Sequence, residues 1–329
     1  MQHRQLGQTD LHVSPVALGC WALIGGFNWG EQDEADSIAA IHAALDAGIN
    51  FFDTAPGYGE GASERLLGRV LAQRRDEVVI ASKVGASDLT PEKLTASCHA
   101  SLERLGTDRI DLYQIHWPNW DVPLDDTLDA MARLRDAGKV RAIGVSNFAP
   151  RDLADALAWG PIASNQLAYN LLARMIEHEI QPMCVDHGVS ILAYSPLMQG
   201  LLTGKFRQAA DVPADRARTR HFASTWPQAR HGQAGCEALT FETIDRVRAI
   251  AHDLGESMGA VALAWCLHQP AVTSVLAGAR NAGQVHDNLA SAALRLDGAT
   301  LAALDEATAT LKQELGPVAD LWAGEPRMR

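Results

Sequence analysis

Short apolar runs alternate with longer amphipathic segments almost from one end of the chain to the other. The apolar runs do not alternate with polar residues, as is typical of parallel strands that are covered on both faces. They predict strands over residues 16–20, 49–53, 78–83, 110–115, 140–145, 163–166, 190–194 and 272–276.

The amphipathic segments between these runs predict helices. Apolar residues recur at helical spacing in 33–47, and Gly48 marks the end of that helix. Ser63 and Glu64 are expected to supply a cap and an acid at the start of the next one. The expected helices cover residues 33–47, 63–72, 91–104, 125–136, 150–158, 178–187, 240–253 and 284–291. About eight βα units in this order predict an α/β fold with a parallel sheet.

Three segments fall outside this alternation. The first fifteen residues are expected to form a small hairpin that plugs the floor of a barrel. Residues 206–236 have no period and predict a long loop after the seventh strand, and the tail after Gly316 is irregular. Because no stretch resembles an interdomain linker, we expect residues 1–329 to form one domain, as α/β barrels of about 250 residues commonly do.

Composition excludes several function classes. Hydrophobic residues make up 47% of the 329 residues, which suits a large buried core. A net charge of -12 argues against a nucleic-acid or anionic-membrane surface. Five scattered cysteines without a Cys-x-x-Cys fit a reducing compartment. The chain shows neither a signal-peptide pattern nor an apolar run of about 20 residues, so the cytoplasm is the expected location.

No metal site is expected. The twelve histidines include no His-Glu-x-x-His motif. The stretch Glu177-His178-Glu179 is interpreted as an exposed helix start rather than a set of ligands.

Chemically useful side chains stand at the ends of three successive apolar runs. Asp53 ends the second run, and Tyr58 follows five residues later. Lys83 ends the third run, and His116 follows the fourth. Because barrels and open α/β sheets build their active sites at the carboxyl ends of strands, we expect these four side chains to lie together.

Together, these groups suit proton transfer to a carbonyl oxygen. A phenol with a pKa near 10 is a weak acid at pH 7, and a neighbouring ammonium stabilises its phenolate. A carboxylate holds that ammonium, and a neutral imidazole orients the carbonyl oxygen or relays the proton. A nicotinamide hydride is the obvious partner to attack the carbon.

Structural roles for the same residues are weaker hypotheses. Taken singly, Asp53 is explained as a helix N-cap, Lys83 as a solvated strand end and His116 as a core histidine. Their occurrence at consecutive strand ends favours catalysis. Residues 57–62 fit a Gly-x-Gly-x-x-Ala dinucleotide pattern, but acidic residues stand where the pyrophosphate would approach. Residues 200–205 are one residue short of a phosphate-binding loop.

The motifs around these residues resemble those of the aldo-keto reductases. The matching stretches are 51–59 with 63–64, 81–83, 114–118 and 144–148. They resemble most the bacterial branch related to potassium-channel β-subunits and to inositol- or sugar-linked oxidoreductases. The resemblance implies a (β/α)8 TIM barrel with an N-terminal β-hairpin and long loops at the C-terminal face. It also implies a catalytic tetrad of Asp53, Tyr58, Lys83 and His116, with Tyr58 as the proton donor.

The resemblance further implies that NADP(H) binds in an extended form. The implied cofactor-binding residues are Gly19, Trp21, Asp53, Ser146, Asn147, Gln166, Tyr194, Ser195, Leu197, Gly200, Leu202, Gly278, Arg280, Gln284 and Asn288. Among them, Tyr194 matches the platform under the nicotinamide ring, and Arg280 matches the partner of the 2′-phosphate. A proline that many relatives carry before Gly278 is missing, so use of NAD(H) stays open.

The expected function is therefore an NADP(H)-dependent oxidoreductase that interconverts aldehydes or ketones, with sugars as candidates, and alcohols. Trp29, Trp117 and Trp120 are expected to line the substrate site, with Trp21 beside them at the mouth. Two alternatives stay open: a Schiff-base lyase that uses Lys83, and an NADP(H)-binding regulatory or sensing subunit with slow turnover. The expected partner is a small carbonyl compound, and the oligomeric state stays unpredicted.

Overall fold

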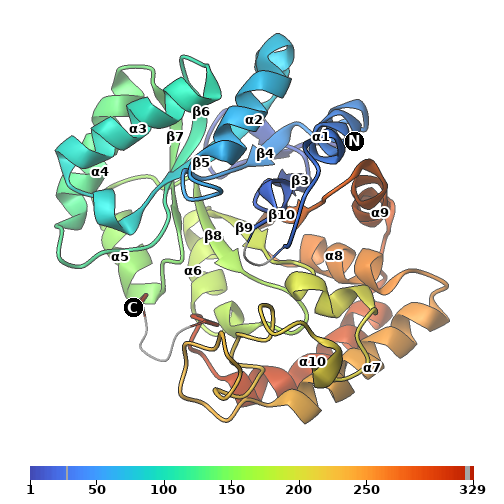
Figure 1. Ribbon diagram of the computed structural model, residues 1–329. Helices are drawn as coiled ribbons and strands as arrows, with labels where there is room; N and C mark the ends of the chain where they lie inside the picture. Colours follow the sequence, from blue (N-terminus) through green and yellow to red (C-terminus); the bar gives the residue numbers. More distant parts are fainter. Residues whose placement is uncertain (27–28, 323–326) are drawn as a thin grey trace.

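Eight parallel strands close into a barrel that is ringed by helices (Figure 1). The computed structural model describes residues 1–26, 29–322 and 327–329. Around the barrel the strands follow the order β10 (Val272–Gly278), β3 (Val16–Gly19), β4 (Phe51–Asp53), β5 (Val79–Val84), β6 (Ile110–Ile115), β7 (Val140–Ser146), β8 (Ser164–Ala168) and β9 (Ser190–Tyr194). The predicted TIM barrel is confirmed, and every predicted strand is present.

Ten α-helices in the described part of the chain surround the barrel. They are α1 (Glu34–Asp46), α2 (Ala62–Leu71), α3 (Pro91–Leu105), α4 (Leu124–Asp136), α5 (Pro150–Trp159), α6 (Ile180–His187), α7 (Glu237–Asp253), α8 (Met258–His268), α9 (Ala282–Ala293) and α10 (Gly298–Leu315). Short 3₁₀ helices occur at η1 (Ala22–Ile24), η2 (Ala72–Glu77), η3 (Ala86–Asp88), η4 (Met175–Glu177), η5 (Met198–Thr203) and η6 (Ala209–Asp211). Within the described residues, no helix is both long enough and apolar enough to cross a membrane.

Two of these helices, α8 and α10, were not predicted. Almost every side chain of α8 is buried, so the helix lacks the polar face that makes an amphipathic pattern visible. Only four of the eighteen residues of helix α10 are buried, so its apolar face is too narrow to give a clear helical pattern. Their position is therefore set by packing on the barrel and on α7 and α9 rather than by a pattern in the sequence.

The N-terminal hairpin plugs the barrel floor as predicted. Strands β1 (Arg4–Gln5) and β2 (His12–Val13) pair antiparallel. Leu6 and Leu11 are buried in the same apolar cluster as the residues inside the barrel. The turn between the strands needs glycine, because Gly7 has φ +53° and a Cβ there would lie 2.3 Å from the carbonyl oxygen of Ala163.

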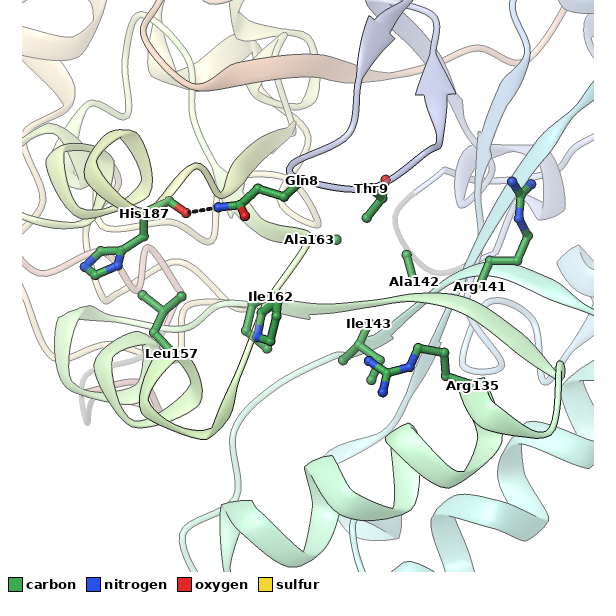
Figure 2. A pocket seen from close by; sticks show the side chains of 11 residues that line it. Gln8, Thr9, Arg135, Arg141, Ala142, Ile143, Leu157, Ile162, Ala163 and His187 are labelled. Atoms are coloured by element: carbon green, nitrogen blue, oxygen red, sulfur yellow. Dashed lines mark hydrogen bonds between the residues drawn. The ribbon is translucent and has the colours of Figure 1, made fainter.

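A small cavity lies beside this hairpin, at the opposite end of the barrel from the strand ends that carry the candidate chemistry. Its volume is about 120 Å³. Figure 2 shows Gln8 pointing toward His187, where its Nε2 donates a 3.0 Å hydrogen bond to the carbonyl oxygen of that residue. Arg135 and Arg141 line the other side of the cavity. These contacts fix the plug to the surrounding strands and helices.

Candidate active site

The alternation of side chains along each strand brings the candidate groups to one rim of the barrel. In β4, Phe51 packs inside the barrel and Phe52 packs against the helices, so Asp53 points inward again. In β5, Ala81 packs inside the barrel, and Lys83 follows it two residues later on the same side. Both polar residues lie toward the carboxyl ends of their strands, at the edge of the hydrophobic core inside the barrel.

Lys83 is the centre of the cluster and is completely buried. Its Nζ lies 2.7 Å from Asp53 Oδ1, 2.9 Å from the carbonyl oxygen of Thr54 and 3.5 Å from the hydroxyl of Tyr58. The second oxygen of Asp53 accepts a 2.8 Å hydrogen bond from Gln166 Nε2. A buried ammonium is thus paired with a carboxylate on one side and reaches a phenol on the other.

The charge states of these groups follow from burial and from Lys83. For Tyr58, burial raises the pKa of the phenol most strongly, the Lys83 charge opposes this and Asp53 adds to it. For Lys83, burial alone lowers the pKa, but Asp53 and Tyr58 outweigh it and keep the pKa raised. Burial, together with Lys83, lowers the pKa of His116 to about 3, so its imidazole is neutral at pH 7. The ring of His116 stands edge-on to Tyr58, with centroids 6.3 Å apart.

The start of α2 holds the Tyr58 loop through side-chain contacts, not through the predicted helix cap. The expected acid is present, because Glu64 lies in the first turn of α2, but the expected cap is wrong, because the N-cap is Gly61 and no side chain caps this helix. Glu64 is fully buried and accepts hydrogen bonds of 2.6 Å from both Ser82 Oγ and Arg104 Nε. A buried carboxylate needs such charged and polar partners, and these come from β5 and α3.

Polar side chains at the ends of β7 and β8 stand next to the cluster. The register pairs Ser146 with Gln166, and Ser146 Oγ donates to the carbonyl oxygen of Gln166 at 3.0 Å. Asn147 has φ +60°, a conformation that costs energy in a non-glycine residue. Its Nδ2 donates to the carbonyl oxygen of His116 at 3.0 Å, and its Oδ1 accepts from the Tyr194 hydroxyl at 2.9 Å.

The residues expected at the adenosine end are gathered after β10. Arg280 Nε donates to Gln32 Oε1 at 2.6 Å, and the amide of Arg280 donates to Gln284 Oε1 at 2.9 Å. Asn288 Nδ2 donates to the carbonyl oxygen of Gly278 at 3.2 Å. The remaining expected cofactor residues follow β3 and β9 on the same side of the barrel, and they are Gly19, Trp21, Ser195, Leu197, Gly200 and Leu202.

The four tryptophans expected at the mouth fall into two pairs. The ring of Trp21 stacks on Tyr58 with centroids 5.9 Å apart, and Trp29 meets Trp21 edge-on at 5.6 Å. This pair therefore lies directly beside the cluster.

The other pair, Trp117 and Trp120, contacts the C-terminal tail. The guanidinium of Arg327 lies 3.8 Å from the centre of the Trp117 ring. Trp120 is 47% exposed, donates its Nε1 to Asp152 at 2.9 Å and borders a separate cavity of about 400 Å³. Asp152 in turn accepts a 2.6 Å hydrogen bond from the amide of Arg329, the last residue.

Two further residues cover the cluster and were missed in the sequence. Trp322 donates its Nε1 to the hydroxyl of Tyr194 at 3.4 Å. The guanidinium carbon of Arg218 lies 4.8 Å from the centre of the Trp322 ring and 5.8 Å from that of Trp21. Both residues come from segments without a regular hydrophobic pattern. Only the length of the 206–236 loop indicated that this region could contribute to the site.

Comparison with known proteins identifies relatives along nearly the whole chain. A sequence model of the Aldo/keto reductase family matches residues 15–309. The aldo-keto reductase YhdN of Bacillus subtilis is 36% identical over 87% of this chain and 87% of its own. The NADH-specific methylglyoxal reductase of Escherichia coli is 33% identical over 96% of this chain and 98% of its own. A probable voltage-gated potassium channel subunit beta of Arabidopsis thaliana is 31% identical, over 88% and 90% respectively.

Solved structures show the same architecture. The glycerol dehydrogenase of Gluconobacter oxydans superposes with a TM-score of 0.82 at 34% identity, covering 94% of this chain and 95% of that one. An aldo-keto reductase of Klebsiella pneumoniae in complex with NADPH gives a TM-score of 0.73 at 27% identity, with coverages of 93% and 95%. The resemblance seen in the sequence motifs, including the branch with potassium-channel subunits, is confirmed.

Proposed function

The chain belongs to the aldo/keto reductase family, and on this premise we propose that it is an NADP(H)-dependent oxidoreductase that interconverts small aldehydes or ketones and alcohols. Sugars are among the candidate substrates. The observation that carries the proposal is the buried series from Asp53 through Lys83 to the Tyr58 hydroxyl, at 2.7 and 3.5 Å. This series ends at a phenolic hydroxyl whose ring stacks on Trp21.

In this proposal Tyr58 gives its proton to the carbonyl oxygen of the substrate. Burial makes the phenol of Tyr58 a weaker acid, because it raises the pKa. The ammonium of Lys83 partly offsets this rise by stabilising the phenolate. Asp53 holds Lys83 in position and keeps it charged. The neutral imidazole of His116 orients the same oxygen without competing as a charged acid. When bound, the nicotinamide supplies the hydride that reaches the carbonyl carbon.

The residues above the barrel suit a nicotinamide dinucleotide. Asn147 and Ser146 offer amide and hydroxyl groups beside the tetrad, and Tyr194 offers a ring at the end of β9. Gln166 would share its amide between Asp53 and the carboxamide. Arg280 is assigned to the 2′-phosphate, since a guanidinium matches phosphate oxygens. The solved relative with NADPH supports NADP(H), and the NADH-specific relative leaves NAD(H) use open.

The surroundings of Lys83 favour this function over a Schiff-base lyase. A lysine nucleophile needs a lowered pKa, whereas Asp53 at 2.7 Å raises the pKa of Lys83. A regulatory or sensing subunit with slow turnover is a second candidate, because relatives at 31% identity are named as potassium channel subunits. A reductase and a sensing subunit would use the same site, and they would differ in the rate at which they turn over a carbonyl compound.

A carbonyl screen tests the proposal. Aldehydes, ketones and sugars are added to the protein with NADPH or NADH, and the nicotinamide absorbance is followed. The reverse reaction is measured with NADP⁺ and alcohols or polyols. We expect turnover with NADPH and a lower kcat/KM with NADH. Tight cofactor binding without turnover of any compound would favour the sensing subunit. Borohydride trapping of substrate on Lys83 would instead favour the lyase.

A further inference from the structure

The loop over residues 206–236 brings positive charge to an acidic protein. Between residues 205 and 230 the chain has six Lys or Arg and two Asp, whereas the whole chain has 28 Lys or Arg and 40 Asp or Glu. This part of the chain follows β9, the seventh strand of the barrel, and carries Arg216 and Arg218 to the aromatic mouth. A local cluster of cations on a chain of net charge -12 creates a site that attracts anions.

Arg218 is a cation of this loop that contacts aromatic rings beside the candidate tetrad. Its guanidinium contacts the rings of Trp21 and Trp322. Trp21 stacks on Tyr58, and Trp322 donates to the hydroxyl of Tyr194. Arg218 therefore contacts one ring beside the proposed proton donor and another beside the proposed nicotinamide platform.

The guanidinium of Arg218 has no anionic partner among the described residues of this protein. Its buried Nε atom makes no hydrogen bond there. Burial is the main cause that lowers the pKa of Arg218, and Arg230 adds to it. Asp215 and Tyr194 oppose the change, but neither forms an ion pair or hydrogen bond with it within the described chain. A partly buried cation in this state is destabilising unless a ligand supplies the missing charge.

The stacking contacts leave Arg218 free to bind an anion. Aromatic rings engage a guanidinium through its flat face, whereas carboxylates and phosphates bind its N–H edge in the plane. Both interactions are therefore available at once. The indole of Trp21 contacts both the guanidinium of Arg218 and the ring of Tyr58. An anion bound here would lie several bonds away from a carbonyl group held at Tyr58.

Resting on the proposed carbonyl reduction, we propose that Arg218 binds a carboxylate or phosphate group carried by the aldehyde or ketone substrate. The residue sets which substrates are preferred and takes no part in proton transfer. The preferred substrates are those whose anionic group is separated from the carbonyl by a spacer about as long as an aromatic ring.

Matched substrate pairs test this assignment. 4-Carboxybenzaldehyde is compared with methyl 4-formylbenzoate, and glyceraldehyde 3-phosphate with glyceraldehyde, in NADPH oxidation at low salt. The first pair probes a carboxylate and the second a phosphate. We expect the wild type to prefer at least one anionic member by about 10- to 100-fold in kcat/KM, the range of a charged hydrogen bond. Equal kcat/KM within both pairs would overturn the assignment.

Arg218→Met should abolish that preference by raising KM for the anionic member, with kcat and the neutral member changed less than about threefold. Arg218→Lys should restore part of the preference, because lysine keeps the positive charge but lacks the paired N–H groups with which a guanidinium binds both oxygens of an anion. Arg207→Met removes one cation from the same loop on its exposed side and should leave the preference intact. An equal loss for both members of a pair would show a merely structural role and contradict the proposal.

Two binding measurements distinguish a substrate-binding Arg218 from one that holds the cofactor. If Arg218→Met weakens NADPH binding, the residue holds a cofactor phosphate and the assignment is wrong. Calorimetry with the NADP⁺ complex compares 4-carboxybenzaldehyde with methyl 4-formylbenzoate, because the oxidised cofactor cannot reduce a carbonyl and no turnover is involved. If no carbonyl is reduced but the acid still binds more tightly through Arg218, the proposed function fails while the anion site stands. If turnover is found but the acid binds no better than the ester, only the anion site fails.

Discussion

The inner cluster of Asp53, Tyr58, Lys83 and His116 and the outer cover of Arg218, Trp322, Arg327 and Arg329 are built in different ways. The cluster stands on or next to neighbouring strands, and its groups are held by short hydrogen bonds between buried polar atoms. The cover comes from a loop and from the tail, and several of its contacts are stacked cations on tryptophan rings. On the functions proposed above, the barrel would fix the chemistry and the cover would select the substrate.

The largest effect should come from the proton donor. Tyr58→Phe keeps the ring that stacks on Trp21 and removes the hydroxyl, so kcat should fall by about 10²- to 10⁴-fold, the usual contribution of a general acid. NADPH affinity, measured by fluorescence titration, should change little. Arg218→Met is the matched variant from the cover and should leave kcat nearly intact. A Tyr58→Phe variant with full turnover would remove Tyr58 from the proposed mechanism.

The next effect should appear in stability. Lys83→Met leaves the buried carboxylate of Asp53 without its cation, and breaking a buried pair in this way costs about 3–5 kcal/mol. The free energy of unfolding in urea should fall by that amount, and activity should be lost. Arg74→Met, which breaks two exposed ion pairs, should cost far less, because solvent screens those charges. Equal costs for the two variants would mean that the buried pair does not stabilise the cluster.

A smaller effect is expected for the tail. Asp152→Ala removes the contacts of Asp152 with the amide of Arg329 and the indole of Trp120. We expect a stability loss of about 1–3 kcal/mol, since the lost hydrogen bonds include ones to a carboxylate. KM for carbonyl substrates should change while kcat stays within a few fold. A kcat loss as large as that of Tyr58→Phe would place the tail in the chemistry and would undo the division between cluster and cover.

The last effect concerns pH and appears only in acid. The pKa of His116 is about 3 in the folded protein and near its ordinary 6.5 when unfolded, so the unfolded chain takes up the proton first. The His116 contribution to stability is therefore full above pH 6.5 and is lost progressively as pH falls towards 3. His116→Gln should reduce this dependence in acid unfolding curves. The wild-type kcat should show no inflection near pH 6.5. An inflection there that disappears in His116→Gln would mean that the imidazole titrates during catalysis.

The sequence predicted the inner region far better than the outer one. Asp53, Lys83 and His116 stand at the ends of apolar runs, so chain order and strand alternation were enough to bring them together. The buried ion pair of Glu64 with Arg104 was not predicted, because Arg104 lies forty residues away on another helix. The cover escaped prediction for the same reason, since Arg218 and Trp322 meet only through tertiary packing and follow no repeat.

Isotope labelling tests directly whether hydride from the nicotinamide reaches the carbonyl carbon. Wild-type protein is mixed with NADPH that carries deuterium at the transferring C4 position and with a reactive aldehyde, and the alcohol is examined by mass spectrometry. We expect one deuterium on the carbinol carbon and an exchangeable solvent proton on the oxygen, with Tyr58→Phe forming almost no product in the same time. Deuterium recovered in water, or an unlabelled alcohol, would contradict hydride transfer at this site.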